Sequence, residues 1–340
     1  MITSPLWLLY ASCAQIPGCG PSDEIVGREN VEGVVFASES AVTYRDGVTR
    51  IGVFFDEQHR QALTFDQLPV AWMVGIVAAE DGRYWSHPGV DAEHIARAAR
   101  DNLEAGAVVA GGSTLTQQTA KMLFERPDRS LDAKFQELDY ALQLEKEYSK
   151  REILTYYANL FHVTGNGSGL AIAARYFFDK EPSELTVLEC AYISGLVKGP
   201  ANYDPFPGDA AQQAEATRRA VERTRYVLSR IGEESLSNLV PKAGEGKTVT
   251  EADVEVVRAE AKRLLAEGFT LPFRPGVFRY DTSAVLDEVT RRLTSEPIAS
   301  TLKAAGVTDP STAGLTVVTT LDPAVQHEAT YGLWHQLSDL

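Results

Sequence analysis

The feature that most constrains the fold of this chain is a nearly continuous helical pattern between Leu68 and Gly232. Three segments within it have the form of a capping box. In this motif a hydroxyl and a side-chain carboxylate or amide three residues later bind amides at the start of a helix. The three segments are Thr114-x-x-Gln117, Ser149-x-x-Glu152 and Thr186-x-x-Glu189. We therefore expect three helices to begin there, in a domain that is mainly α.

Apolar spacing indicates how some of these helices pack. The helix that follows Ser130 has apolar residues at spacings of four, three and four, which predicts one face directed toward a core. These residues are Leu131, Phe135, Leu138 and Leu142. The helix after Thr186 is apolar nearly all round, so we expect it to be central. Ala210–Glu234 and Thr250–Phe269 are rich in charge and are predicted to be solvated helices, separated by the linker Pro241–Lys247.

The two ends of the chain have short β patterns. Alternation and a turn at Arg45-Asp46-Gly47 predict a hairpin within Ser38–Phe55. Leu315–Thr320 alternates as a strand, and Asp322-Pro323 then predicts the start of a helix that runs to Leu340.

Composition excludes some classes of protein. The 340 residues include 47 acidic and 32 basic side chains, a net charge of −15, which argues against a partner held through nucleic-acid phosphates. Cys13, Cys19 and Cys190 have no metal-binding spacing, so structural zinc is not expected. The apolar stretch Pro5–Ala14 is shorter than the ~20 residues of a spanning helix, so we expect the membrane anchor to be missing or incomplete. Lipidation of Cys13 and a Cys13–Cys19 disulfide are open alternatives.

Two carboxylates follow an apolar helix. The run Val70–Ala79 leads directly into Glu80 and Asp81. The negative end of the helix dipole and the apolar surroundings should both raise the pKa of Glu80, which suits a proton acceptor that works near neutral pH. The alternative is an ordinary pair of solvated surface carboxylates.

A second group of polar residues follows. Gly111 and Gly112 lead into a helix start whose free amides would favour an anion, with Gln117 and Lys121 one turn apart on one face. Farther along the chain, Lys134 precedes Glu137 by three residues. Glu137 lies beside the apolar stripe of its helix, and a surface ion pair with Lys134 is the simpler interpretation.

These segments together resemble the five motifs of the peptidoglycan glycosyltransferases, glycosyltransferase family 51, which form the polymerase half of class A penicillin-binding proteins. Glu80-Asp81-Gly-Arg-Tyr-Trp-Ser-His87-Pro-Gly89 is similar to the first motif, E-D-x-x-F-x-x-H-x-G. The second to fifth motifs are matched, in order, by Gly112–Lys121, Lys134–Glu137, Lys150–Asn159 and Gly167–Phe177.

The resemblance implies a lysozyme-like, two-lobed, mainly α (α+β) domain with a small N-terminal β leader and a C-terminal helical and linker tail. We expect an N-terminal segment over 1–37 and the glycosyltransferase domain over 38–232. A helical linker region over 233–313 and the start of a linker that precedes a transpeptidase domain, 314–340, would follow.

The resemblance also implies roles for single residues. Glu80 would be the general base, and Glu137 a second catalytic carboxylate that assists the leaving pyrophosphate directly or through Mg²⁺ or Mn²⁺. Asp81 and Lys134 would support the site. The substrate pyrophosphate would be held by Ser113, Thr114, Gln117, Lys121 and Arg129.

The substrate implied is lipid II, extended into a growing glycan strand at the membrane surface on the outer, periplasmic face of the bacterial cytoplasmic membrane, with other cell-wall synthesis proteins as further partners. The sequence departs from the family at Met122, where Asn is usual, and at Ala133, where Arg is usual. The loss of that Arg predicts weaker donor binding. A lysozyme-like glycan hydrolase and a catalytically impaired cell-wall scaffold are the alternative functions.

Overall fold

The computed structural model describes residues 26–93, 95, 100, 103, 104, 112–124, 131–165, 167–276 and 284–338. The chain divides into a helical unit, residues 1–36 with 63–275, and a strand unit, residues 37–62 with 276–340. This division differs from the boundaries expected from sequence. The hairpin belongs with the C-terminal segment, and residues 233–275 belong with the helical domain.

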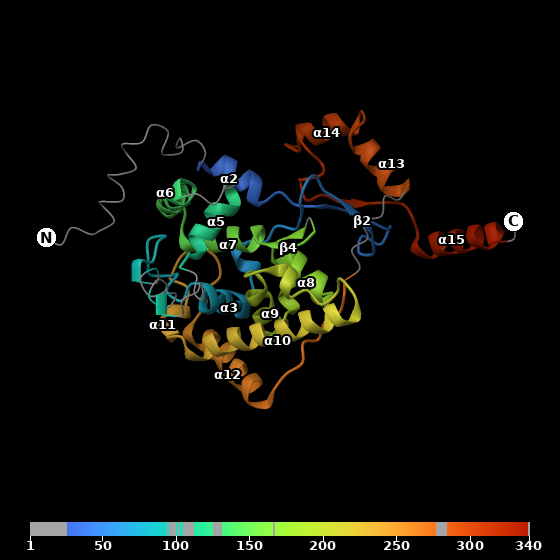
Figure 1. Ribbon diagram of the computed structural model, residues 1–340. Helices are drawn as coiled ribbons and strands as arrows, with labels where there is room; N and C mark the ends of the chain where they lie inside the picture. The colour runs from blue at the N-terminus through green and yellow to red at the C-terminus, as the bar shows by residue number, and fades with distance from the viewer. Residues whose placement is uncertain are drawn as a thin grey trace. The chain divides into compact units, whose positions relative to one another are not determined.

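The helical unit begins at Val26 within the described residues. Its α-helices can be followed by their labels in Figure 1. They are α2 (Arg28–Val35), α3 (Val70–Glu80), α5 (Leu115–Leu123), α6 (Leu131–Glu147), α7 (Lys150–Leu160), α8 (Leu170–Phe178), α9 (Val187–Leu196), α10 (Ala210–Glu233), α11 (Leu236–Leu239) and α12 (Glu251–Glu267). Three 3-10 turns, η1 (Phe65–Gln67), η2 (Pro182–Glu184) and η3 (Pro200–Asn202), and an antiparallel pair, β4 (His162–Thr164) and β5 (Gly167–Ser168), complete it.

All three predicted capping boxes are present. The hydroxyls of Thr114, Ser149 and Thr186 accept hydrogen bonds from the backbone N–H three residues on, at 3.2, 3.3 and 3.3 Å. The side chain at that third position binds back to the amide of the capping residue in each case. A lost cap of this kind costs about 1 kcal/mol, so each box fixes where its helix begins.

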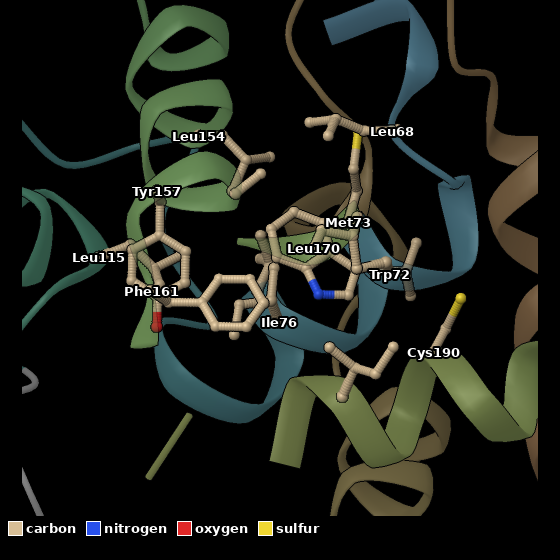
Figure 2. Close-up of a cluster of buried hydrophobic side chains, with 14 of the residues drawn as sticks. Leu68, Trp72, Met73, Ile76, Leu115, Leu154, Tyr157, Phe161, Leu170 and Cys190 are labelled. Carbon is tan, nitrogen blue, oxygen red and sulfur yellow. The ribbon is translucent and has the colours of Figure 1, made fainter. Parts of the chain in front are cut away.

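Helix α3 lies in the core of the helical unit, and every residue from Ala71 to Ala78 is buried. Trp72, which Figure 2 shows with Phe161 among the buried side chains, stacks on that ring at a centroid distance of 6.2 Å. Burial of a large apolar side chain contributes about 1.5–3 kcal/mol, so this helix is a major source of stability. Helix α9 packs against α3 and is buried from Glu189 to Leu196, which confirms its predicted central position.

The prediction of which face of α6 is buried is wrong. Phe135 is 46% exposed, and the buried positions are instead Ala133, Glu137, Ala141 and Leu144. These recur at spacings of four, four and three, so they form a different face of the same helix. The face that the unit buries carries small residues and a carboxylate, which hydrophobic spacing alone does not identify.

Helices α10 and α12 are not simply solvated, as their charge suggested. α10 buries Ala220, Thr224, Val227, Leu228 and Ile231 and packs against α9, α3 and α12. The segment expected to be a linker is also held in place. The Arg151 guanidinium donates to the backbone carbonyls of Lys242, Glu245 and Lys247 at 3.0, 2.8 and 3.0 Å.

The strand unit contains the predicted hairpin. β1 (Ser40–Thr43) pairs antiparallel with β2 (Arg50–Phe54) and parallel with β6 (Thr316–Val318), which confirms the strand expected late in the sequence. The parallel pairing aligns Val42 with Val317 and explains why the hairpin groups with the C-terminal segment. The other elements are β3 (His59–Arg60), α13 (Ala284–Leu293), α14 (Ile298–Ala304) and α15 (Pro323–Ser338). Within the described residues, no helix combines the length and apolarity needed to cross a bilayer.

Candidate active site around the start of α5

The candidate site lies where α3 ends and α5 begins, inside the helical unit. Glu80 is the last residue of α3 and its side chain is 16% exposed. The Arg223 guanidinium, from α10, donates to Glu80 Oε1 at 2.6 Å. Gln118, from α5, also hydrogen bonds to the Glu80 carboxylate, and the Tyr157 hydroxyl donates to Gln118 Oε1 at 3.1 Å. Groups from α10 and α5 therefore orient this carboxylate, and Tyr157 from α7 orients Gln118 in turn.

Burial sets the basicity of Glu80. Desolvation raises the pKa of Glu80, and this effect exceeds the opposing attraction of Arg223, the hydrogen bond from Gln118 and the charge of Lys198. Burial also raises the pKa of Tyr157 well above that of a free tyrosine, with the Glu80 carboxylate adding to the shift. The predicted direction for Glu80 is confirmed, and its largest cause is removal from water.

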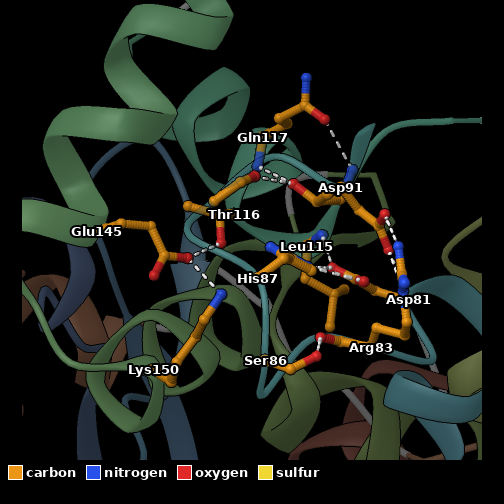
Figure 3. Close-up of polar contacts among 12 residues, drawn as sticks. Asp81, Arg83, Ser86, His87, Asp91, Leu115, Thr116, Gln117, Glu145 and Lys150 are labelled. Carbon is orange, nitrogen blue, oxygen red and sulfur yellow. Dashed lines mark hydrogen bonds and ion pairs between the residues drawn. The ribbon is translucent and has the colours of Figure 1, made fainter. Parts of the chain in front are cut away.

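Asp81 is fully buried, and its carboxylate binds a different set of groups from that of Glu80. Its Oδ2 accepts a 2.9 Å hydrogen bond from the Leu115 backbone N–H, and both its oxygens lie 3.0 Å from His87 Nε2 (Figure 3). The anion at the start of α5 is therefore a carboxylate of the protein. Free amides were expected there, and this expectation is wrong, because Leu115 N–H is bound by Asp81 and Gln117 N–H by Thr114.

Thr114 and Gln117 are buried parts of the cap. The Thr114 hydroxyl donates to the Gly89 carbonyl at 2.5 Å, and Gln117 Oε1 accepts from the Thr114 backbone N–H at 2.9 Å. Arg83, in the loop between Asp81 and Gly89, binds Asp91 through its Nε at 2.9 Å. These contacts tie the first motif to the second.

Glu137 and Lys134 come together on α6, as their spacing predicted, but Glu137 is buried and Lys134 only half-buried. Glu137 is 5% exposed and its carboxylate contacts the Lys134 ammonium, which also donates to Ser113 Oγ at 3.1 Å. Ser113 lies five positions before Gln118, which binds Glu80. Gln118 on α5 thus binds Glu80 directly, and Ser113 just before α5 is linked to Glu137 through Lys134.

A third ion pair supports this region. Lys150 Nζ lies 2.6 Å from Glu145 Oε1 and 4.4 Å from the centre of the Tyr84 ring. The Thr116 hydroxyl binds the same carboxylate oxygen, and the Tyr84 hydroxyl donates to the Lys150 carbonyl at 2.6 Å. Figure 3 shows Glu145 between Thr116 and Lys150. These groups bind one another, so they stabilise the backbone around the site.

The remaining predicted residues are less constrained. Lys121 is exposed on α5, Met122 packs partly buried against the core, and Ala133 is 4% exposed. Arg129 lies outside the described residues.

Sequence reasoning missed three residues at the site: Arg223, Gln118 and Tyr157. Gln118 and Tyr157 lie inside the second and fourth motifs, so the motifs themselves could have drawn attention to them. Arg223 lies on a charge-rich helix among four other arginines, and nothing in the local pattern distinguishes it.

The donor set near Glu137 does not fit a metal site. Among the described residues, no three His, Cys, Asp or Glu side chains form a cluster that would hold a metal ion. The Glu137 carboxylate contacts the Lys134 ammonium, a cation that cannot share a ligand oxygen readily with a divalent ion.

A desolvated carboxylate with a raised pKa, held at the end of an apolar helix by a cationic side chain, has the features of a general base in an enzyme active site. A family model described as "Transglycosylase" matches residues 47–231, more than half of the chain. The chain belongs to this family and is a glycosyltransferase, as the motifs predicted.

Two similar curated proteins have the same name. Penicillin-binding protein 1A of Aquifex aeolicus (strain VF5) is 37% identical over 177 residues, which are 52% of this chain and 23% of that protein. Penicillin-binding protein 1A of Neisseria flavescens is 36% identical over 189 residues, 56% of this chain and 23% of that protein. The chain thus spans less than a quarter of the length of these relatives. A solved structure of penicillin-binding protein 1A from Haemophilus influenzae aligns with a TM-score of 0.37 and 18% identity over 86% of this chain and 28% of that one.

Proposed function

We propose that this chain polymerises peptidoglycan, joining lipid II units into β-1,4-linked glycan strands with release of undecaprenyl pyrophosphate. The observation that carries the proposal is the environment of Glu80. This carboxylate is desolvated at the end of an apolar helix, has a raised pKa, and is oriented by groups from α5 and α10. A base tuned toward neutral pH is what deprotonation of a sugar hydroxyl requires.

Glu80 takes the proton of the acceptor's 4-hydroxyl as its oxygen attacks the anomeric carbon of the donor. The new carbon–oxygen bond forms on the face opposite the leaving group, so the configuration inverts. The bond from the anomeric carbon to the pyrophosphate breaks, and its electron pair leaves with the pyrophosphate oxygen. The proton is then on Glu80, and the negative charge that Glu80 carried is balanced by the new negative charge on the released pyrophosphate.

The leaving group distinguishes a polymerase from a hydrolase. An alkoxide leaving group must be protonated, whereas a pyrophosphate leaves as a stable anion and is assisted by cations and hydroxyl groups. Lys134 and Ser113 lie together beside Glu137, and Lys121 is exposed on the same helix as Gln118. We assign pyrophosphate binding to Ser113, Lys134, Lys121 and Arg129.

The other predicted contacts support the site from within. Asp81, Thr114 and Gln117 are buried and hydrogen-bonded at the start of α5, so we assign them to holding that helix start in place. Glu137 anchors the Lys134 ammonium and stabilises the leaving group through it.

Because the proposed substrate is a lipid, the reaction takes place at the outer face of the cytoplasmic membrane. Other cell-wall synthesis proteins are its partners there.

The residue at position 133, Ala133, bears on the affinity for the glycosyl donor. Arg at this position in the family would add a cation near the pyrophosphate, so we expect the Ala133→Arg variant to bind donor more tightly. Because Ala133 is buried, the free energy of unfolding of this variant must be measured together with its donor affinity.

The test is incubation of the purified chain with fluorescent lipid II, followed by gel analysis of the polymer. We expect polymer from the unmodified chain and at least a 10²-fold lower rate from Glu80→Gln, since general-base catalysis contributes about 10²–10⁴-fold. Release of soluble fragments from finished glycan would support a hydrolase instead.

Glu189→Gln is the matched control. Glu189 is also a buried carboxylate that contacts a cation, Lys180 at 2.8 Å, and Gln can still close its capping box. Equal loss of rate in both variants would mean that any buried carboxylate matters in this way, and would count against the assignment of Glu80.

A further inference from the structure

Arg223 contacts Glu80 from a helix that contains none of the five motifs. Its Nη2 lies 2.6 Å from Glu80 Oε1, and its Nε donates to the Gly195 carbonyl at 3.2 Å. The guanidinium also lies over the Tyr226 ring, 4.6 Å from the centroid. Three contacts of different kinds therefore fix a side chain that is only 12% exposed.

The packing of α9 against α10 leaves a path for this side chain. A Cβ at Gly195 would lie 2.9 Å from Arg223 Cγ, closer than such atoms approach, and 3.3 Å from Val227 Cγ2, which is a tight contact. Glycine at this position thus lets the Arg223 stem run along α9 to the end of α3. The other arginines on α10 that the structure pairs contact acidic residues of the same helix or its cap, as in Arg219 with Glu215.

The contact engages one carboxylate oxygen. Arg223 binds Glu80 Oε1, and Gln118 is held with its carbonyl oxygen toward Tyr157, so its amide N–H groups are the ones that face the carboxylate. Proton transfer needs a lone pair aimed at the reacting hydroxyl, and a rotating carboxylate would lose that alignment. A fixed Oε1 leaves Oε2 at a defined orientation.

We propose that Arg223 is the positioning residue of the general base: it holds Glu80 by Oε1, favours the deprotonated carboxylate, and directs Oε2 to the acceptor hydroxyl. The proposal rests on the proposed function, in which Glu80 is the base. The acceptor's O–H bond breaks, its proton goes to Oε2, and Arg223 remains protonated throughout.

The charged and titratable groups that face Glu80 are Arg223 from α10, Lys198 after α9 and Tyr157 from α7, with Gln118 from α5 as a neutral donor. Of these charges, the attraction of Arg223 is the larger opposing influence on the Glu80 pKa. Removal of Arg223 should therefore raise the pKa of Glu80 further and move the acid limb of the rate profile to higher pH.

The experiment compares Arg223→Gln, Arg223→Lys and the control Arg219→Gln, which removes an exposed arginine from the same helix. Lipid II turnover is measured against pH and substrate concentration. We expect Arg223→Gln to lose about 10²-fold in kcat with little change in KM, and its acid limb to move to higher pH. Lysine keeps the charge but not the forked contacts, so Arg223→Lys should restore the acid limb and only part of kcat. Arg219→Gln should behave as the unmodified chain.

A second measurement does not depend on turnover. The Glu80 carboxyl carbon is followed by NMR in protein labelled with ¹³C-glutamate, with Glu80→Gln used to assign the signal. A titration midpoint that moves to higher pH in Arg223→Gln and returns in Arg223→Lys supports the proposal. An unmoved midpoint would overturn it, and so would a loss of kcat in Arg223→Gln matched by an equal loss in folded protein. Absence of turnover in the unmodified chain would count against the proposed function, while the NMR titration would still decide whether Arg223 governs Glu80.

Discussion

Asp81 Oδ2 accepts a 2.9 Å hydrogen bond from the backbone N–H of Leu115, the first residue of α5. The carboxylate that follows Glu80 is therefore bound to the start of the helix that carries Gln118. An anion at a helix N-terminus is stabilised by the helix dipole and by the unpaired amide. This one contact fixes the end of α3 against the beginning of α5, so it also fixes the surroundings of Glu80.

Substitution of Asp81 by Asn should therefore destabilise the helical unit and lower activity as a consequence. Asn keeps one acceptor oxygen but loses the charge, and its N–H₂ group has to face either His87 or the amide of Leu115. Because Asp81 is fully buried, we expect a loss of about 1–3 kcal/mol in the free energy of unfolding, measured by urea denaturation. Asp209→Asn, at the exposed N-cap of α10, should change it by only a few tenths, since Asn and Asp cap equally well. Equal effects at both positions would contradict this assignment.

The raised pKa of Glu80 predicts that the carboxylate needed as a base lowers the stability of the fold when it ionises. A carboxyl group whose pKa is higher in the folded chain binds its proton more tightly there than in the unfolded chain. Between the ordinary value of 4.5 and the raised value, the free energy of unfolding should therefore fall as pH rises. Glu80→Gln cannot ionise and should not show this fall.

Urea unfolding at several pH values provides the test. Near pH 7.5 the Glu80→Gln variant should be at least as stable as the unmodified chain, and below about pH 4 the two should coincide. A variant that is less stable at the higher pH would show that the contact with Arg223 outweighs the cost of burial.

Much of the fold follows from local signals in the sequence. The capping boxes, the apolar run of α3 and the turn at Asp46 each depend on residues within a few positions, and each is present in the structure. The family motifs identify Glu80 in the same way. The features that local spacing does not predict are determined by tertiary contacts. The buried face of α6 is set by what α5 and α7 present to it, and the pairing of β1 with β6 joins residues about 275 positions apart.

Arg223 illustrates the same limit at the site. Its helix looks solvated in sequence because arginines and glutamates dominate it, and its contact with Glu80 spans 143 positions. Only the packing of α10 on α9 and α3 brings that one arginine to the carboxylate.

Gly195→Ala tests whether that packing is needed. A methyl group would lie 2.9 Å from Arg223 Cγ, so Arg223 would have to move from Glu80. We expect overpacking to cost about 1–3 kcal/mol and the rate of lipid II turnover to fall, with the acid limb moving in the same direction as in Arg223→Gln. Gly232→Ala on α10 is the control, because its new methyl group would find no atom nearer than 3.7 Å. That variant should gain up to about 1 kcal/mol in stability and keep its turnover.

The contact between Lys134 and Glu137 predicts strong energetic coupling between two side chains of one helix turn. Glu137 is buried, and Lys134 binds both its carboxylate and the Ser113 hydroxyl, so loss of Lys134 leaves a carboxylate with little access to water. In a double-mutant cycle of Lys134→Met and Glu137→Gln, followed by urea unfolding, we expect a coupling free energy of about 1–3 kcal/mol. The exposed pair of Arg219 and Glu215 on α10 should give about 0.3–0.5 kcal/mol in the same measurement. Coupling of Lys134 and Glu137 as weak as that of the exposed pair would mean that Glu137 does not depend on Lys134, and the proposal that this carboxylate acts on the leaving group through the lysine would then fail.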